Sequence, residues 1–157
     1  MKVWETIRAN HAAKRHWITT TELIAIIVVI GILLGLIIAT QTSNAEQQKN
    51  TERKRDISEL HVELESYYSQ YSKYPTLAEL NNITWRTTYM KGVTTQVFRD
   101  PSGTSYHLVT MPTKNVYAYH ATSATGTACN DTTTPCLQYT LTTTLEGGTT
   151  YVQNNLN

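Results

Sequence analysis

The chain is poor in cysteine and in charged residues. Only two of its 157 residues are cysteines, which excludes a framework of several disulfides and a zinc site built from four thiolates. Charged residues make up 16% of the chain and the net charge is +1, so the clustered basic surface of a nucleic-acid binder is not indicated. Threonine is abundant where charged residues are few. Of the 28 threonines, 20 lie from residue 84 onward, which favours an extracellular β domain over a cytosolic enzyme.

Charged and apolar residues are segregated along the chain. Residues 1–17 carry four basic side chains and one acid, a net charge of +3. Residues 23–39 contain no charged or polar side chain, and with residues 18–21 and Thr40 the segment is long enough to cross a bilayer, which takes about 20 residues. Because the basic residues precede this segment, the positive-inside rule places the N-terminus in the cytoplasm. We therefore predict a single-pass membrane protein whose C-terminal bulk lies outside.

Two ordinary targeting segments share this layout. One is a signal anchor, and the other is a cleaved secretory signal, with the small residues Ser43-Asn44-Ala45 before Glu46. The apolar stretch is longer than the 7–15 residues of a secretory core. Glu22 fits neither alternative well, since a carboxylate at a membrane edge is costly and marks function by default. It also lies in the first turn of the expected helix, where the macrodipole favours an anion.

From Glu22 onward the segment resembles the type IV pilins and the pseudopilins of type II secretion. In that family a basic leader precedes a peptidase cut, a glutamate follows four residues after the new N-terminus, and a glycine follows nine residues further on. Glu22 and Gly31 have this spacing, which places the new N-terminus at Ile18 and the cut after Trp17. The family has glycine before the cut, where this chain has Trp17. Cleavage by a prepilin peptidase, with methylation of the Ile18 amine, is thus one outcome, and an uncleaved subunit that stays in the membrane is the other.

The resemblance implies a structural subunit of a type IV pilus-like filament. Glu22 of one subunit would meet the Ile18 amine of its neighbour as subunits leave the membrane, since an unpaired carboxylate is expensive in an apolar environment. The implied partners are other pilin subunits, an inner-membrane platform and an assembly ATPase. The filament, on the cell surface, would serve adhesion, motility, DNA uptake or secretion. The rival interpretation is a membrane-anchored extracytoplasmic binding domain that does not polymerise.

No enzymatic chemistry is indicated. The sequence offers no nucleophile–base arrangement, no phosphate-binding loop and no paired carboxylates, so we predict neither catalysis nor a cofactor.

Residues 46–73 contain no glycine or proline and predict an amphipathic helix. Its apolar stripe, at intervals of three and four, comprises Ile57, Leu60, Leu64, Tyr67 or Tyr68, and Tyr71. We expect the membrane segment 18–41 and the amphipathic segment 42–73 to form one helical spine that stops before Pro75, with a coiled coil as the alternative. Thr76-Leu77-Ala78-Glu79 reads as a capping box that opens a short helix.

Residues 74–157 predict a small antiparallel sheet. Residues 106–111 and 116–121 flank a hairpin turn at 112–115, and residues 137–145 alternate as a half-buried strand that Gly147-Gly148 turns back towards Tyr151. We expect an α+β fold in which three or four strands pack on the helical stripe 57–71. Lys73-Tyr74-Pro75 and Asp100-Pro101-Ser102-Gly103 resemble the corresponding corner and turn of pilins.

Cys129 and Cys136 bracket six residues. Outside the cell this pair predicts a disulfide, worth about 2–3 kcal/mol by loop entropy, and a disulfide often staples the C-terminal region of pilins. Two free thiols are the alternative. A zinc site would need two more ligands: His107 and His120 lie opposite each other in the predicted hairpin, but the cysteine spacing is wider than zinc sites use. We therefore predict no metal.

Overall fold

The computed structural model describes residues 19–130 and 132–156, apart from the side chains of residues 38–42. Its elements in order are α1 (Thr20–Tyr71), α2 (Leu77–Leu80), α3 (Ile83–Tyr89), the 3-10 helix η1 (Thr95–Phe98), β1 (Ala118–Thr122), β2 (Gln138–Thr144) and β3 (Thr150–Asn154). The chain divides after Thr42 into an N-terminal and a C-terminal unit, which we describe separately. The architecture is α+β, with an apolar N-terminal helix and a three-stranded antiparallel sheet.

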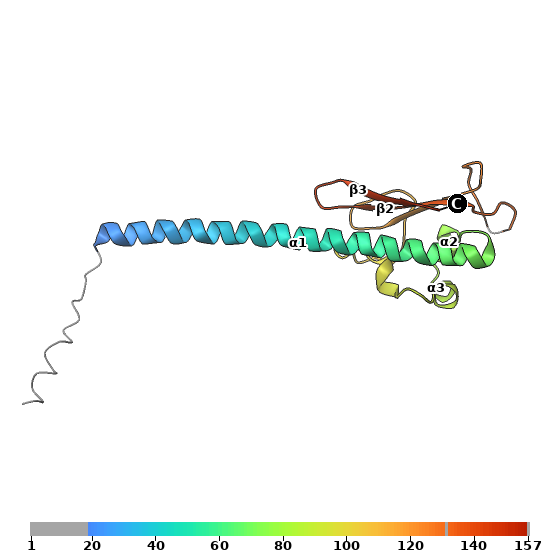
Figure 1. The fold of residues 1–157 in the computed structure, drawn as a ribbon, viewed down its shortest axis with the longest axis horizontal. Helices are drawn as coiled ribbons and strands as arrows, with labels where there is room; N and C mark the ends of the chain where they lie inside the picture. Colours follow the sequence, from blue (N-terminus) through green and yellow to red (C-terminus); the bar gives the residue numbers. More distant parts are fainter. Residues whose placement is uncertain (1–18, 131, 157) are drawn as a thin grey trace, which may run out of the picture. The chain divides into compact units, whose positions relative to one another are not determined.

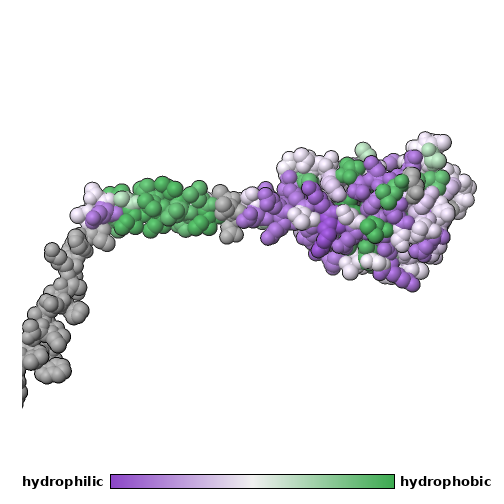
Figure 2. All heavy atoms as spheres, viewed as in Figure 1, coloured by the Kyte–Doolittle hydropathy of each residue, from purple (hydrophilic) through white to green (hydrophobic). Residues whose placement is uncertain are grey.

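The N-terminal unit contains the first part of α1. Its segment Thr20–Ile37 is long and apolar enough to cross a membrane, and none of it is buried within the chain. Figure 2 shows the part of this segment that follows Glu22 as a continuous hydrophobic surface. The segment is apolar on every side rather than along one stripe, which is typical of a helix that is surrounded by lipid or by other helices.

In the C-terminal unit, local sequence signals set the ends of the helices. Helix α1 ends at Tyr71, because Ser72 adopts a left-handed conformation with φ of 56°. The predicted capping box is confirmed: the Thr76 hydroxyl accepts a hydrogen bond from the Glu79 amide, and the Glu79 carboxylate accepts one from the Thr76 amide. Helices α3 and η1 were not predicted, because residues 83–98 were expected to belong to the β region.

The sheet has the order β1-β2-β3, and both pairs are antiparallel. Leu141 in the central strand pairs with Tyr119 on one side and with Gln153 on the other. Gly147 and Gly148 both have positive φ, as a tight hairpin turn requires. The predicted strand 137–145 and its glycine turn are therefore confirmed.

The predicted hairpin between residues 106–111 and 116–121 is wrong. Val109 does pair with Ala118, but the bridge is parallel, so the two segments run in the same direction. The backbone groups of Val109 face residues 117–119: its amide donates to the Tyr117 carbonyl at 3.0 Å, and its carbonyl accepts from the Tyr119 amide at 2.8 Å. The Leu108 carbonyl and amide face the other way and pair with the Asn81 side chain, at 2.9 Å and 2.8 Å. Asn81, the C-cap residue of α2, thus anchors this segment on the side that faces away from residues 117–119.

The loss of the hairpin also removes the predicted opposition of His107 and His120. Both side chains are exposed, and among the described residues no group of three or more His, Cys, Asp or Glu side chains is placed to hold a metal ion.

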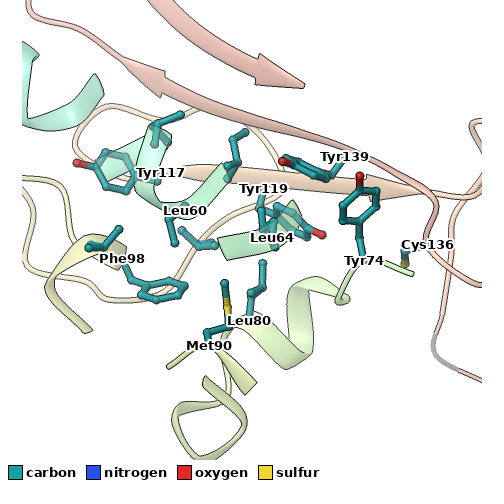
Figure 3. Close-up of a cluster of buried hydrophobic side chains, with 14 residues drawn as sticks. Leu60, Leu64, Tyr74, Leu80, Met90, Phe98, Tyr117, Tyr119, Cys136 and Tyr139 are labelled. Atoms are coloured by element: carbon teal, nitrogen blue, oxygen red, sulfur yellow. The ribbon is translucent and has the colours of Figure 1, made fainter. Parts of the chain in front are cut away.

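The core lies between the second part of α1 and the sheet (Figure 3). Helix α1 contributes Ile57, Leu60 and Leu64, all at most 1% exposed, which confirms that the sheet packs on this part of the predicted stripe. The facing and flanking members of the core are Tyr74, Leu80, Met90, Phe98, Leu108, Tyr117, Tyr119, Tyr139 and Leu141. Four of these are tyrosines, so the core carries hydroxyl groups that need partners.

The end of the stripe departs from the prediction. The Tyr71 side chain remains 44% exposed, and both Tyr67 and Tyr71 contact the rings of α3. In Figure 1, β2 and β3 lie on one side of α1 and α3 lies on the other. Within the C-terminal unit, the second part of α1 thus has packed elements on two sides.

Candidate functional site

The predicted assembly residue Glu22 lies at the N-terminal end of the exposed apolar helix. Its Oε2 atom accepts hydrogen bonds from the Thr19 amide at 2.9 Å and from the Thr19 hydroxyl at 3.0 Å. The Glu22 amide in turn approaches the Thr19 hydroxyl oxygen at 3.4 Å. This is the reciprocal arrangement of a capping box, so Glu22 helps to start α1. Its Oε1 atom has no hydrogen bond to any described residue and can accept a donor from another molecule.

The apolar surface beyond Glu22 is continuous. Twelve large side chains between Leu23 and Ile37 are each 47–61% exposed: Leu23, Ile24, Ile26, Ile27, Val28, Val29, Ile30, Ile32, Leu33, Leu34, Leu36 and Ile37. A Cβ atom placed on Gly31 would meet nothing within 4 Å, so no packing inside the chain requires this glycine. The other two predicted residues of this region, Trp17 and Ile18, lie outside the described residues.

The predicted disulfide between Cys129 and Cys136 is present, with 5.1 Å between the two Cα atoms. Cys136 is 1% exposed, and its carbonyl accepts a hydrogen bond from the Tyr74 amide at 2.8 Å. This hydrogen bond ties the loop before β2 to the corner that follows α1, and the disulfide closes the loop itself.

A buried ion pair joins α1 to two distant turns. The Arg53 side chain is 1% exposed; its Nε lies 2.7 Å from Asp100 Oδ2 and its Nη2 lies 3.1 Å from Asp100 Oδ1. Nη2 also donates to Glu146 at 3.1 Å, in the turn between β2 and β3. The hydrogen bond from Arg53 to Asp100 raises the pKa of the guanidinium above its ordinary value. Asp100, which lies in the turn that resembles the Asp-Pro turn of pilins, thus helps to hold the fold together.

Asp56 is a second buried charge on α1. Its Oδ2 accepts a hydrogen bond from the Tyr117 hydroxyl at 2.8 Å, and the side chain is 3% exposed. Burial raises the pKa of this carboxyl to about 6, although the bond from Tyr117 and the nearby Arg55 act in the opposite direction. Burial and the facing carboxylate raise the pKa of Tyr117, so its hydroxyl remains a neutral donor.

A third polar contact lies further along the same interface. The Tyr139 hydroxyl donates to Glu65 Oε1 at 2.9 Å and lies 2.6 Å from His61 Nδ1. The Tyr74 hydroxyl bonds to the same carboxylate, at 3.0 Å from Oε2. Burial and the Glu65 carboxylate raise the pKa of Tyr139. These groups hold α1 against the sheet.

A buried cation fixes α3. Arg86 is 5% exposed; it donates to the carbonyls of Leu80 and, at 2.7 Å, Tyr106, and it stacks on Phe98 with 3.8 Å to the ring centroid. Burial lowers its pKa to about 10.

The predicted apolar stripe leaves out Arg53, Asp56 and Glu65, and no sequence motif indicates a role for His61 or Arg86. The Asp100-Pro101 turn was the one local signal near these contacts, and nothing in its sequence pointed to Arg53.

Comparisons with protein-family models, with curated proteins and with solved structures find no match to this chain.

Proposed function

We propose that the chain is a structural subunit of a type IV pilus-like filament that assembles through its apolar N-terminal helix. The observation that carries the proposal is the lone carboxylate of Glu22 at the start of a helix whose apolar side chains are exposed on all sides. In the proposal the two parts of α1 form one spine, with the membrane segment in the filament centre and the C-terminal unit at its surface.

Lipid and neighbouring helices are equally good covers for the apolar side chains. Moving such a helix from lipid to a bundle therefore gains little hydrophobic free energy, and polar contacts between helices decide the association. Glu22 Oε1 is the acceptor available for such a contact. In the proposal its partner is the amine of Ile18 in a neighbouring subunit, after cleavage between Trp17 and Ile18. That pair fixes the axial register, because any other register leaves a carboxylate unpaired in an apolar environment.

The capping geometry favours a specific alternative. If Glu22 serves only to start α1, the protein is a single-pass membrane anchor for an extracytoplasmic binding domain that does not polymerise. The two functions make different demands on the side chain. A cap needs an acceptor at the third helical position, and glutamine provides one. The intersubunit pair needs the negative charge.

Glu22→Gln therefore separates the two. We expect this variant to accumulate in the membrane at the normal level but to be at least tenfold depleted from sheared surface filaments of the producing cell. Glu46→Gln removes an exposed carboxylate from the same helix outside the apolar segment and serves as the matched control. If Glu22→Gln entered filaments at the normal level, capping would be the remaining role of Glu22 and the intersubunit pair would be contradicted.

The mature N-terminus, measured by intact mass, gives an independent result. A start at Ile18, with or without a methyl group, supports processing as a pilin. A start at Met1 in filaments supports an unprocessed subunit, and a start at Glu46 contradicts the proposal because the apolar helix would be lost.

A further inference from the structure

Four aromatic rings gather where α3 packs on the end of α1, and we call them the aromatic surface: Tyr67, Tyr71, Trp85 and Tyr89. Tyr67 is 5% exposed and forms the floor. Tyr71 and Tyr89 are 44% and 42% exposed, and Trp85 is half-buried. The core of the C-terminal unit is complete without the exposed parts of these rings.

The four rings form two nearly parallel pairs. Tyr67 and Tyr71 are close to parallel, at 30°, with centroids 4.4 Å apart, and Trp85 and Tyr89 are close to parallel, at 33°, with centroids 5.0 Å apart. Tyr89 stands at 81° to Tyr71 and at 86° to Tyr67. The aromatic surface therefore presents ring planes in two nearly perpendicular orientations.

The polar ends of the exposed rings are unused. The Tyr71 and Tyr89 hydroxyls and the Trp85 indole N–H form no hydrogen bond to the described part of the chain. By contrast, the core tyrosines Tyr117 and Tyr119 each donate to an internal acceptor. The surface thus offers donors and acceptors beside apolar ring faces, on side chains that lose little entropy when they bind.

The surroundings of the aromatic surface are close to neutral. Residues 66–71 of α1 carry no charge, and the one charge of α3, Arg86, is buried and bonded to carbonyl groups. Glu63 accepts from the Gly92 amide at 2.9 Å, and Lys91 follows α3 as an exposed cation. A single-stranded nucleic acid also stacks on aromatic rings but needs a positively charged groove. The near neutrality here therefore favours an uncharged ligand.

We propose that the aromatic surface binds neutral β-linked oligosaccharides. The C–H groups on the face of a β-linked pyranose carry partial positive charge and stack on the negative face of an aromatic ring. The hydroxyl groups at the edge of the same sugar exchange hydrogen bonds with the free ends of Tyr71, Trp85 and Tyr89. This inference does not depend on polymerisation, since every residue involved belongs to one C-terminal unit.

The test uses the full chain, purified as a monomer in a zwitterionic detergent without a sugar headgroup. The chain has tryptophans at positions 4, 17 and 85, so the background variant Trp4→Phe/Trp17→Phe makes Trp85 the sole tryptophan reporter. We expect cellohexaose to produce a saturable change in its emission. We also expect the sugar to reduce acrylamide quenching of Trp85, a readout that needs no change in the aromatic surface.

Substitutions locate the site. Tyr71→Ala and Tyr89→Ala should each weaken binding about three- to tenfold, the range expected for one aromatic contact, whereas Tyr71→Phe should retain most of the affinity. Tyr151→Ala removes a half-buried ring on β3, outside the aromatic surface, and is the matched control. Thermal unfolding by circular dichroism identifies any variant that fails to fold.

Several results would overturn the inference. They are the absence of saturable emission and quenching changes with both cellohexaose and chitohexaose, unchanged affinity in a folded Tyr89→Ala variant, and tighter binding of oligothymidylate than of cellohexaose. Because the experiment uses the unassembled monomer, none of these results bears on the proposed filament.

Discussion

Replacing Asp56 by asparagine should stabilise the C-terminal unit at neutral pH. Asparagine has nearly the same shape, and its carbonyl oxygen can still accept the hydrogen bond that the Tyr117 hydroxyl donates to Asp56 Oδ2 at 2.8 Å. What the substitution removes is the negative charge, which the folded protein holds at 3% exposure.

The sign follows from the raised pKa. The Asp56 carboxyl titrates near pH 6 in the folded state and near its ordinary value of 3.8 in the unfolded chain. Between these two values the folded state binds more protons, so stability falls as the pH rises through this window. A pKa difference of about two units means that the Asp56 charge lowers the stability of the folded state by about 3 kcal/mol. This loss is present in full above pH 6 and absent below pH 4. The buried asparagine N–H group costs about 1 kcal/mol without a partner, so the expected net gain is about 2 kcal/mol.

The assay is urea unfolding of the full chain in detergent, followed by near-ultraviolet circular dichroism at several pH values from 3.5 to 7.5. We expect Asp56→Asn to exceed the wild type by about 2 kcal/mol at pH 7.5, and we expect this advantage to vanish at pH 3.5. Glu59→Gln, which removes a carboxylate that is 45% exposed on the same helix, should change little at any pH. A loss of stability in Asp56→Asn at pH 7.5, or a pH profile parallel to that of the wild type, would refute the reasoning.

Two further substitutions test the links between distant segments, by the same unfolding measurement. Arg53→Met leaves Asp100 and Glu146 without their cation in a buried site and should cost about 3–5 kcal/mol. Adding Asp100→Asn to it should recover part of that loss, and full additivity of the two changes would contradict a direct pair. Cys129→Ser opens the loop closed by Cys136 and should cost about 2.5 kcal/mol. A reducing agent should lower the stability of the wild type equally and leave this variant unchanged.

Elements whose signals are local could be predicted from the sequence. The capping box at Thr76 and Glu79 lies within four residues, and the Gly147-Gly148 turn needs positive φ at both positions. The alternation of residues 137–145 reflects burial on one face of β2, where Tyr139 and Leu141 are at most 2% exposed. In each case the physical cause acts over a few neighbouring residues, so the pattern is visible without the fold.

Elements that depend on distant side chains could not be predicted. In place of the expected hairpin, Val109 forms a parallel bridge to Ala118, and Asn81 binds both backbone groups of Leu108, 27 residues away. The end of the apolar stripe turned out to face α3, a seven-residue helix that depends on Arg86 and on ring contacts for its position. Neither contact leaves a trace in local periodicity, because a polar side chain that binds the backbone of a remote segment looks like any other polar residue.

The buried charges of α1 could not be predicted for the same reason, because their partners are distant in sequence. These charges fix the helix against the sheet. An apolar stripe alone specifies register weakly, since shifting α1 by one turn would exchange Leu60 for Leu64 in similar surroundings. The same shift would withdraw Arg53 from Asp100, which breaks a buried ion pair at a cost of about 3–5 kcal/mol. It would also take the buried Asp56 carboxylate away from the Tyr117 hydroxyl that donates to it. Polar partners 47 and 61 residues away in sequence therefore exclude the alternative that the apolar contacts permit. The residues that a helical pattern assigns to solvent are, in this unit, the ones that select a single packing.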